Sequence, residues 1–196
     1  MNLPNKLTVF RIVLVPIIVT FLLCDFMSNN YLYAFLLFLI AAYTDHMDGK
    51  IARKTGAITN FGKFADPLAD KILVICCLIC LVQANLVNIV ALIIIVCREF
   101  VVTSVRLVAV EQGKVIPANN WGKLKTVSQV SAILSIIGMR AVKELISNFS
   151  GGFSLGVYDL ISSIIGEILV WIAVIMTIIS GIIYVYENRS LIKDVG

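Results

Sequence analysis

The sequence predicts an all-α integral membrane protein with six transmembrane helices and a short N-terminal interfacial segment. Of its 196 residues, 60% are hydrophobic and 14% are charged, and the mean hydropathy is +0.99. Soluble domains contain about 45–50% apolar and about 25% charged residues, so this chain has more apolar surface than one core of its size can bury. We expect residues 1–196 to form a single membrane-embedded domain.

Uncharged apolar runs mark the expected spans, because a transmembrane helix needs about 20 such residues. The run 72–97 exceeds one span once its charged extensions are counted. Its middle is interrupted by Gln83, Asn85 and Asn88, so we expect a hairpin of two helices there. The expected apolar segments are 12–24, 31–44, the two halves of 72–97, 127–139 in a helix that starts near Trp121, and 168–186, with 147–156 as a loop.

Lysine and arginine are distributed unequally between the two sides of this arrangement. The N-terminus, the second and fourth connections and the C-terminus share the side that is rich in basic residues, whereas the opposite side carries only Arg140 and Lys143. Basic residues are in excess on the cytoplasmic side of membrane proteins. We therefore expect a multi-pass protein of the cell membrane, with both termini and the active site on the cytoplasmic side.

Charge and cysteine content exclude two other classes of function. The net charge of +4 is too small to indicate binding of nucleic acid. The five cysteines lie in apolar runs, and the only histidine is His46, so we expect free thiols and no structural zinc site.

The N-terminal segment has no small-residue cleavage signal and is expected to be retained.

Four aspartates occur where the second expected helix ends and the third begins. Asp45 and Asp48 are three residues apart, and Asp66 and Asp70 are four apart, so each pair shares one face of its helix. An antiparallel hairpin brings both pairs to one level, where the carboxylates repel one another unless a cation lies between them. Oxygen ligands favour Mg²⁺, Ca²⁺ or Mn²⁺. The pattern predicts a site that can hold two such ions and bind phosphate oxygens.

The alternative is that these aspartates only cap helices and pair with neighbouring basic residues such as Arg53. Ionisable groups at membrane depth are costly and usually have a function. Capping also does not require two pairs at helical spacing with glycines between them. We therefore favour the metal site.

The residues around this cluster resemble the signature of the CDP-alcohol phosphatidyltransferases. In this sequence it is Asp45-x-x-Asp48-Gly49-x-x-Ala52-Arg53, eight intervening residues, and Gly62-x-x-x-Asp66-x-x-x-Asp70. All eight signature positions hold the expected residue at the expected spacing. The segments 2–11 and 122–126, and Arg98-Glu99 with Arg106, are similar to bacterial family members that use glycerol 3-phosphate. The resemblance covers residues 2 to 130; the last third of the chain shares only hydrophobicity with the family.

The resemblance implies a six-helix membrane enzyme, usually a homodimer, that transfers a phosphatidyl group from CDP-diacylglycerol to an alcohol and releases CMP. It implies two divalent metal ions, Mg²⁺ in the first place and Mn²⁺ as the alternative. Asp70 would also be the general base that deprotonates the acceptor hydroxyl. By the family pattern the metal ligands are Asp45, Asp48, Asp66 and Asp70, and the contacts to the nucleotide and CDP-diacylglycerol are Asn5, Thr8, Gly49, Ala52, Arg53 and Gly62.

The acceptor end of the site is expected to be basic. Arg98 and Arg106 are eight residues apart, about two helical turns, and so lie on roughly one face. Lys123 and Lys125 begin the fifth helix. Four cations near the aspartates suit the phosphate of glycerol 3-phosphate, although each could also be an ordinary basic residue of the cytoplasmic side. Glu99 is interpreted as a structural partner of Arg98.

Three functional hypotheses follow, with the surrounding membrane lipids as partners in each. The first is transfer of the phosphatidyl group to glycerol 3-phosphate, with inositol phosphate or serine as the alternative acceptor. The second is a divalent-cation carrier, which would distribute carboxylates across the depth of the membrane, whereas here they gather at one face. The third is a purely structural subunit, which would leave the aspartates without a purpose.

Overall fold

The computed structural model describes residues 3–24, 27–55, 60–113, 116, 119–149 and 156–189, without the side chains of 3–5, 45–55, 60–67, 111 and 149. Within these ranges the chain forms six α-helices and no strand, as the sequence predicts. They are α1 (Leu3–Leu23), α2 (Asn30–Thr55), α3 (Asn60–Gln83), α4 (Ile89–Glu111), α5 (Asn120–Phe149) and α6 (Gly156–Glu187). The segment expected at the membrane interface is the first part of α1.

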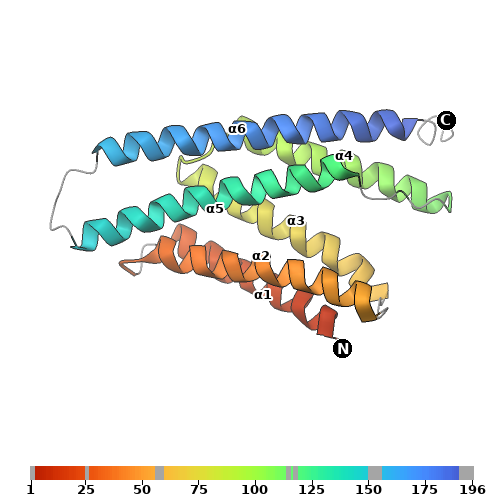
Figure 1. The fold of residues 1–196 in the computed structure, drawn as a ribbon, viewed down its shortest axis with the longest axis horizontal. Coiled ribbons are helices and arrows are strands. Elements are labelled where there is room, and N and C mark those ends of the chain that lie inside the picture. Colours follow the sequence, from red (N-terminus) through yellow and green to blue (C-terminus); the bar gives the residue numbers. More distant parts are fainter. Residues whose placement is uncertain are drawn as a thin grey trace.

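The helices form an elongated bundle in which consecutive helices run in opposite directions (Figure 1). α1 packs against α2 and α3, α5 packs against α2 and α6, and α4 packs against α6. The start of α1, the end of α2, the start of α3, the end of α4, the start of α5 and the end of α6 lie at one end of the bundle (Figure 1). We call this the charged end, because the sequence places most of the basic residues there.

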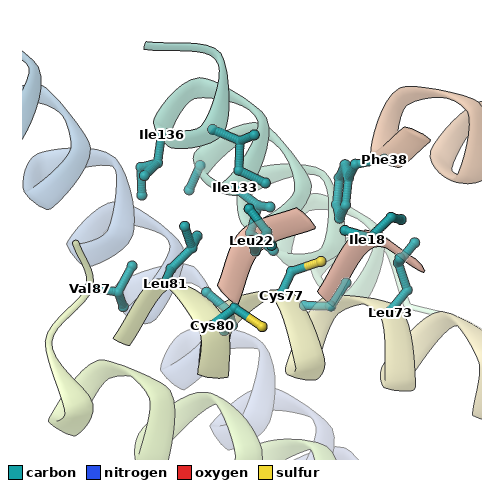
Figure 2. Packing of buried hydrophobic residues seen from close by; sticks show 14 of the residues in the cluster. Ile18, Leu22, Phe38, Leu73, Cys77, Cys80, Leu81, Val87, Ile133 and Ile136 are labelled. Atoms are coloured by element: carbon teal, nitrogen blue, oxygen red, sulfur yellow. The ribbon is translucent and has the colours of Figure 1, made fainter. Parts of the chain in front are cut away.

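The core lies where α1, α2, α3 and α5 meet (Figure 2). Ile18 of α1, Phe38 of α2, Cys77 of α3 and Ile133 of α5 are all fully buried in it. Helices in lipid gain little from excluding water from one another, so close packing of such side chains holds the bundle together. All five cysteines are free, as expected.

The α3–α4 hairpin forms at the polar residues that interrupt the long apolar run. Asn85 has φ 57°, a left-handed conformation that asparagine tolerates better than most residues. Asn88 caps α4, because its side-chain oxygen accepts a hydrogen bond from the backbone amide of Val90 at 2.8 Å. The other end of α4 is closed by Gly113, which adopts φ +71°.

The start near Trp121 expected for the fifth helix is confirmed, but the expected loop and the expected start of the last helix are wrong. α5 continues to Phe149, into the segment expected to be a loop, and α6 starts at Gly156 instead of Ile168. Contacts between the two helices explain the extension. The hydroxyl of Tyr158 donates to the carbonyl of Met139 at 2.7 Å, and Asp159 pairs with Lys143 at 2.7 Å and with Arg140 at 3.6 Å.

The outward face of α6 is almost continuously apolar. Two described helices, α6 and residues 6–23 of α1, are long and apolar enough to cross a membrane, and the apolar part of α2 is shorter. Soluble proteins rarely expose large contiguous apolar patches, so this face fits lipid. The exposed residues on α6 are Val157, Leu160, Ile161, Ile164, Ile165, Ile168, Trp171, Ile172, Ile175, Ile178, Ile182 and Tyr186.

Candidate active site

The paired aspartates lie on two consecutive helix segments at the charged end. Asp45 and Asp48 lie in the last part of α2, and Asp66 and Asp70 lie in the first part of α3 (Figure 1). Among the described side chains no group of three metal-binding residues occurs. The side chains of eight predicted site residues lie outside the described part of the chain: Asn5, Asp45, Asp48, Gly49, Ala52, Arg53, Gly62 and Asp66. Their predicted roles stay predictions.

Thr8, the described member of the predicted nucleotide-binding set, lies one turn before Arg11 on α1. Both side chains are fully buried, with 0% of their surface exposed. Because α1 packs between α2 and α3, Thr8 is placed inside the helix contact.

Asp70 lines a cavity of about 400 Å³ that is open to the surface and is bordered by α3, α4, α5 and α6 at the charged end. The four residues predicted to bind the acceptor phosphate line the same cavity: Arg98, Arg106, Lys123 and Lys125. The structure therefore places these cations in one cavity with Asp70, the carboxylate that the family resemblance implies is the general base.

Two of these four cations are tied to one buried carboxylate. Glu99, 8% exposed, forms an ion pair with Arg98 at 3.3 Å and a second one with Lys125, which is 5% exposed. The guanidinium of Arg98 also donates to the hydroxyl of Ser180 on α6 at 2.6 Å. Arg106 and Lys123 are exposed, and neither forms an ion pair among the described residues. Arg98 and Lys125 are thus held by Glu99, whereas the other two cations line the cavity with exposed side chains.

A further lysine joins this network from α3. Lys71 donates a hydrogen bond to the hydroxyl of Thr103, which itself donates to the backbone carbonyl of Glu99 at 2.6 Å. Glu99 therefore connects with α3 through Thr103, with α5 through Lys125 and with α6 through Arg98 and Ser180. One residue of α4 links all the helices that line the cavity.

The electrostatics of the cavity act on its two inner lysines. Lys71 and Lys125 lie just before the apolar runs that start at Ile72 and Val127. Burial lowers the pKa of both lysines, because it disfavours the charged ammonium group. The nearby carboxylate of Glu99 acts in the opposite direction and raises the pKa of each. Glu99 therefore favours the protonated form of both.

Sequence reasoning missed the contribution of α6 to this cavity. Ser180 and Tyr184 line it, and both are buried. The hydroxyl of Tyr184 has no hydrogen-bond partner in the described part of the chain. A signal was present, because Thr177, Ser180 and Tyr184 recur at three- and four-residue spacing within an otherwise apolar run. Such a polar stripe indicates a helix face that contacts protein or a cavity instead of lipid.

Comparison with known proteins identifies the family of the chain. A family model described as CDP-alcohol phosphatidyltransferase matches residues 1–179, which extends the match well into the last third of the chain. The chain is 38% identical to a CDP-diacylglycerol–glycerol-3-phosphate 3-phosphatidyltransferase of Bacillus subtilis, over 98% of this chain and 97% of that protein. A protein of the same name from Rickettsia typhi is 39% identical, over 93% of this chain and 94% of its own length. Another from Haemophilus influenzae is 33% identical, over 98% of this chain and 96% of its own length.

Proposed function

Because this chain belongs to the CDP-alcohol phosphatidyltransferase family, we propose that it transfers the phosphatidyl group of CDP-diacylglycerol to glycerol 3-phosphate. The products would be phosphatidylglycerophosphate and CMP, in the biosynthesis of phospholipids. The names of relatives that match nearly the full length of the chain support this choice of both substrates.

The observation that carries the choice of acceptor is the charge of the cavity. Five lysine and arginine side chains and two carboxylates line it, an excess of three positive charges. A phosphate monoester carries about two negative charges at neutral pH, so it would be attracted strongly. An acceptor without net charge, such as serine or free inositol, would not offset this excess, because Glu99 supplies only one negative charge to the two buried cations Arg98 and Lys125.

The donor set at the α2–α3 junction fits two divalent metal ions. Asp45 and Asp48 on α2, with Asp66 and Asp70 on α3, would hold them, because these are four carboxylates at helical spacing in the last part of α2 and the first part of α3, both at the charged end. Oxygen-only ligands suit Mg²⁺ and also Mn²⁺. When bound, the ions would supply neutralisation of the diphosphate of CDP-diacylglycerol.

The cavity residues would orient the acceptor for an in-line displacement. Arg98, Arg106, Lys123 and Lys125 would bind the phosphate of glycerol 3-phosphate, so that the hydroxyl at its other end faces Asp70. Asp70 would accept the hydroxyl proton while the hydroxyl oxygen forms a bond to the phosphorus that carries diacylglycerol. The bond from that phosphorus to the CMP oxygen breaks, and CMP leaves. Fixed orientation of the two reactants would account for much of the acceleration.

The orientation and assembly of the protein form part of the proposal. The chain is a membrane protein by its family and its apolar helices. The charged end, with both termini and the cavity, would face the cytoplasm, since the basic residues gather there. Residues 1–196 would act as one domain, and two copies would form a homodimer.

Release of CMP tests the proposed reaction. Purified protein in detergent would be incubated with CDP-diacylglycerol, Mg²⁺ and either glycerol 3-phosphate, inositol phosphate, serine or inositol. We expect CMP only with glycerol 3-phosphate, none after chelation of the metal and none from Asp70→Asn. Release with another alcohol alone would change the acceptor, and no release with any of them from folded protein would refute the proposal.

A further inference from the structure

The carboxylate of Glu99 occupies an unusual position in a pocket for an anion. It lies among the cations that would attract a phosphate, and it is itself buried. A negative charge at this place weakens the attraction for a second negative charge. If the pocket depended on net charge alone, Glu99 would be a disadvantage, so its presence calls for another role.

The contacts of Glu99 indicate that role. Neighbouring residues on a helix point about 100° apart, so Arg98 reaches Glu99, at 3.3 Å, only if its side chain turns toward it. The other guanidinium nitrogen, Nη2, is held by Ser180 at 2.6 Å. Gly181 leaves room for the side chain of Arg98 to pass α6, because a Cβ at this position would lie 3.0 Å from Cγ of Arg98. Arg98 is thus held at two nitrogens and confined along its stem.

Lys125 depends on the same carboxylate. Its ammonium group is buried and pairs with Oε1 of Glu99, the oxygen that also contacts Arg98. Two cations from α4 and α5 therefore meet at a single oxygen. Without that oxygen they would repel each other and move apart.

We propose that Glu99 is a positioning residue for the acceptor: it holds Arg98 and Lys125 side by side, so that both face one phosphate group. This inference rests on the proposed function. Glu99 does not touch the substrate. Its negative charge lowers the net positive charge of the pocket, but its carboxylate fixes the positions of Arg98 and Lys125.

The substitution Glu99→Gln separates this role from an effect of charge. It removes one negative charge and keeps the shape, so a pocket that acts through net charge would bind glycerol 3-phosphate more tightly. Positioning predicts the opposite. We expect the KM for glycerol 3-phosphate to rise about tenfold or more, as for the loss of a charged hydrogen bond, with the KM for CDP-diacylglycerol unchanged. An unchanged or lower KM for glycerol 3-phosphate would overturn the proposal.

A second pair of variants covers the case in which Glu99→Gln fails to fold, since a buried cation without its partner destabilises a protein strongly. Ser180→Ala removes the other anchor of Arg98 without leaving a charge unpaired. Its matched control is Thr177→Val, which removes a buried hydroxyl one turn away on α6 that bonds Gln129 at 3.0 Å and does not line the cavity. We expect a higher KM for glycerol 3-phosphate in Ser180→Ala only. An equal KM for glycerol 3-phosphate in Ser180→Ala and Thr177→Val would contradict the proposed positioning.

Binding of inorganic phosphate, measured by calorimetry in detergent, separates failure of this inference from failure of the proposed reaction. If the wild-type protein releases no CMP with glycerol 3-phosphate, the proposed function is wrong. The role of Glu99 is then decided by phosphate affinity alone. Weaker binding in Glu99→Gln and Ser180→Ala than in the wild type and Thr177→Val supports positioning, and equal or tighter binding refutes it.

Discussion

The carboxylate of Glu144 on α5 accepts hydrogen bonds from the backbone amide of Tyr31 at 3.0 and 3.2 Å, and from the amide of Leu32 at 3.3 Å. Tyr31 lies in the first turn of α2, where backbone amides have no partner within their own helix. A side chain that is 113 residues away in sequence thus caps the start of α2. The negative charge also complements the positive end of the helix dipole.

Loss of this cap should destabilise the protein without affecting substrate binding. We expect Glu144→Ala to reduce the free energy of unfolding by about 1–3 kcal/mol, seen as a lower thermal midpoint in detergent. Glu144→Gln keeps one acceptor oxygen, so the free energy of unfolding should fall by less than in Glu144→Ala. Equal midpoints for the wild type and Glu144→Ala would show that the cap contributes nothing.

The exposed cations of the cavity should contribute to acceptor binding. We expect Arg106→Ala and Lys123→Ala each to raise the KM for glycerol 3-phosphate about tenfold, because each would remove a charged hydrogen bond to phosphate. Arg189→Ala is the matched control, since Arg189 lies near the charged end but stacks on Tyr186, 4.5 Å from its ring centre. Steady-state kinetics at several concentrations of acceptor checks this, and a similar effect of Arg189→Ala would indicate general attraction by surface charge.

Gly181 should be sensitive to a single added carbon. In Gly181→Ala the new Cβ would lie 3.0 Å from Cγ of Arg98, so the arginine side chain must shift, and we expect its hydrogen bond to Ser180 to weaken. We expect the KM for glycerol 3-phosphate to rise about fivefold, equivalent to one hydrogen bond. The control is Gly166→Ala, whose Cβ meets Cγ1 of Ile136 at 3.2 Å, away from the cavity. It should lower the thermal midpoint and leave this KM unchanged.

Cys24 offers a test of orientation in the membrane. Its side chain is exposed, and it directly follows α1 at the end of the bundle opposite to the charged end. We expect a membrane-impermeant maleimide to label Cys24 in intact cells, with the signal absent from Cys24→Ser. Labelling that requires permeabilised cells would place the charged end outside the cytoplasm.

The sequence was sufficient to predict those parts of the fold that depend on local pattern. Asn85 and Asn88 mark the α3–α4 hairpin because a turn and a helix cap need side chains of that type. The start of α6 could not be predicted in this way. Ser162 and Glu167 interrupt the apolar run, and the contacts that extend the helix, such as that of Tyr158 with Met139, are made to another helix.

The same distinction holds for the candidate site. The eight-residue spacing of Arg98 and Arg106 was enough to expect them on one face, and both line the cavity. The pairing of Glu99 with Lys125 was not predicted, because the two residues are 26 positions apart and no local pattern relates them. Ser180 was missed because hydropathy averages hide one hydroxyl in an apolar helix.

The shared oxygen of Glu99 has a consequence for how this pocket can change during evolution. Replacing Arg98 or Lys125 alone leaves one balanced ion pair with Glu99, whereas replacing Glu99 alone leaves two buried cations in contact without a counter-charge. A descendant that accepts an uncharged alcohol would therefore have to lose one of the two cations before it loses the carboxylate. The three charges can thus be removed through stable intermediates only in an order that leaves Glu99 until after the first cation.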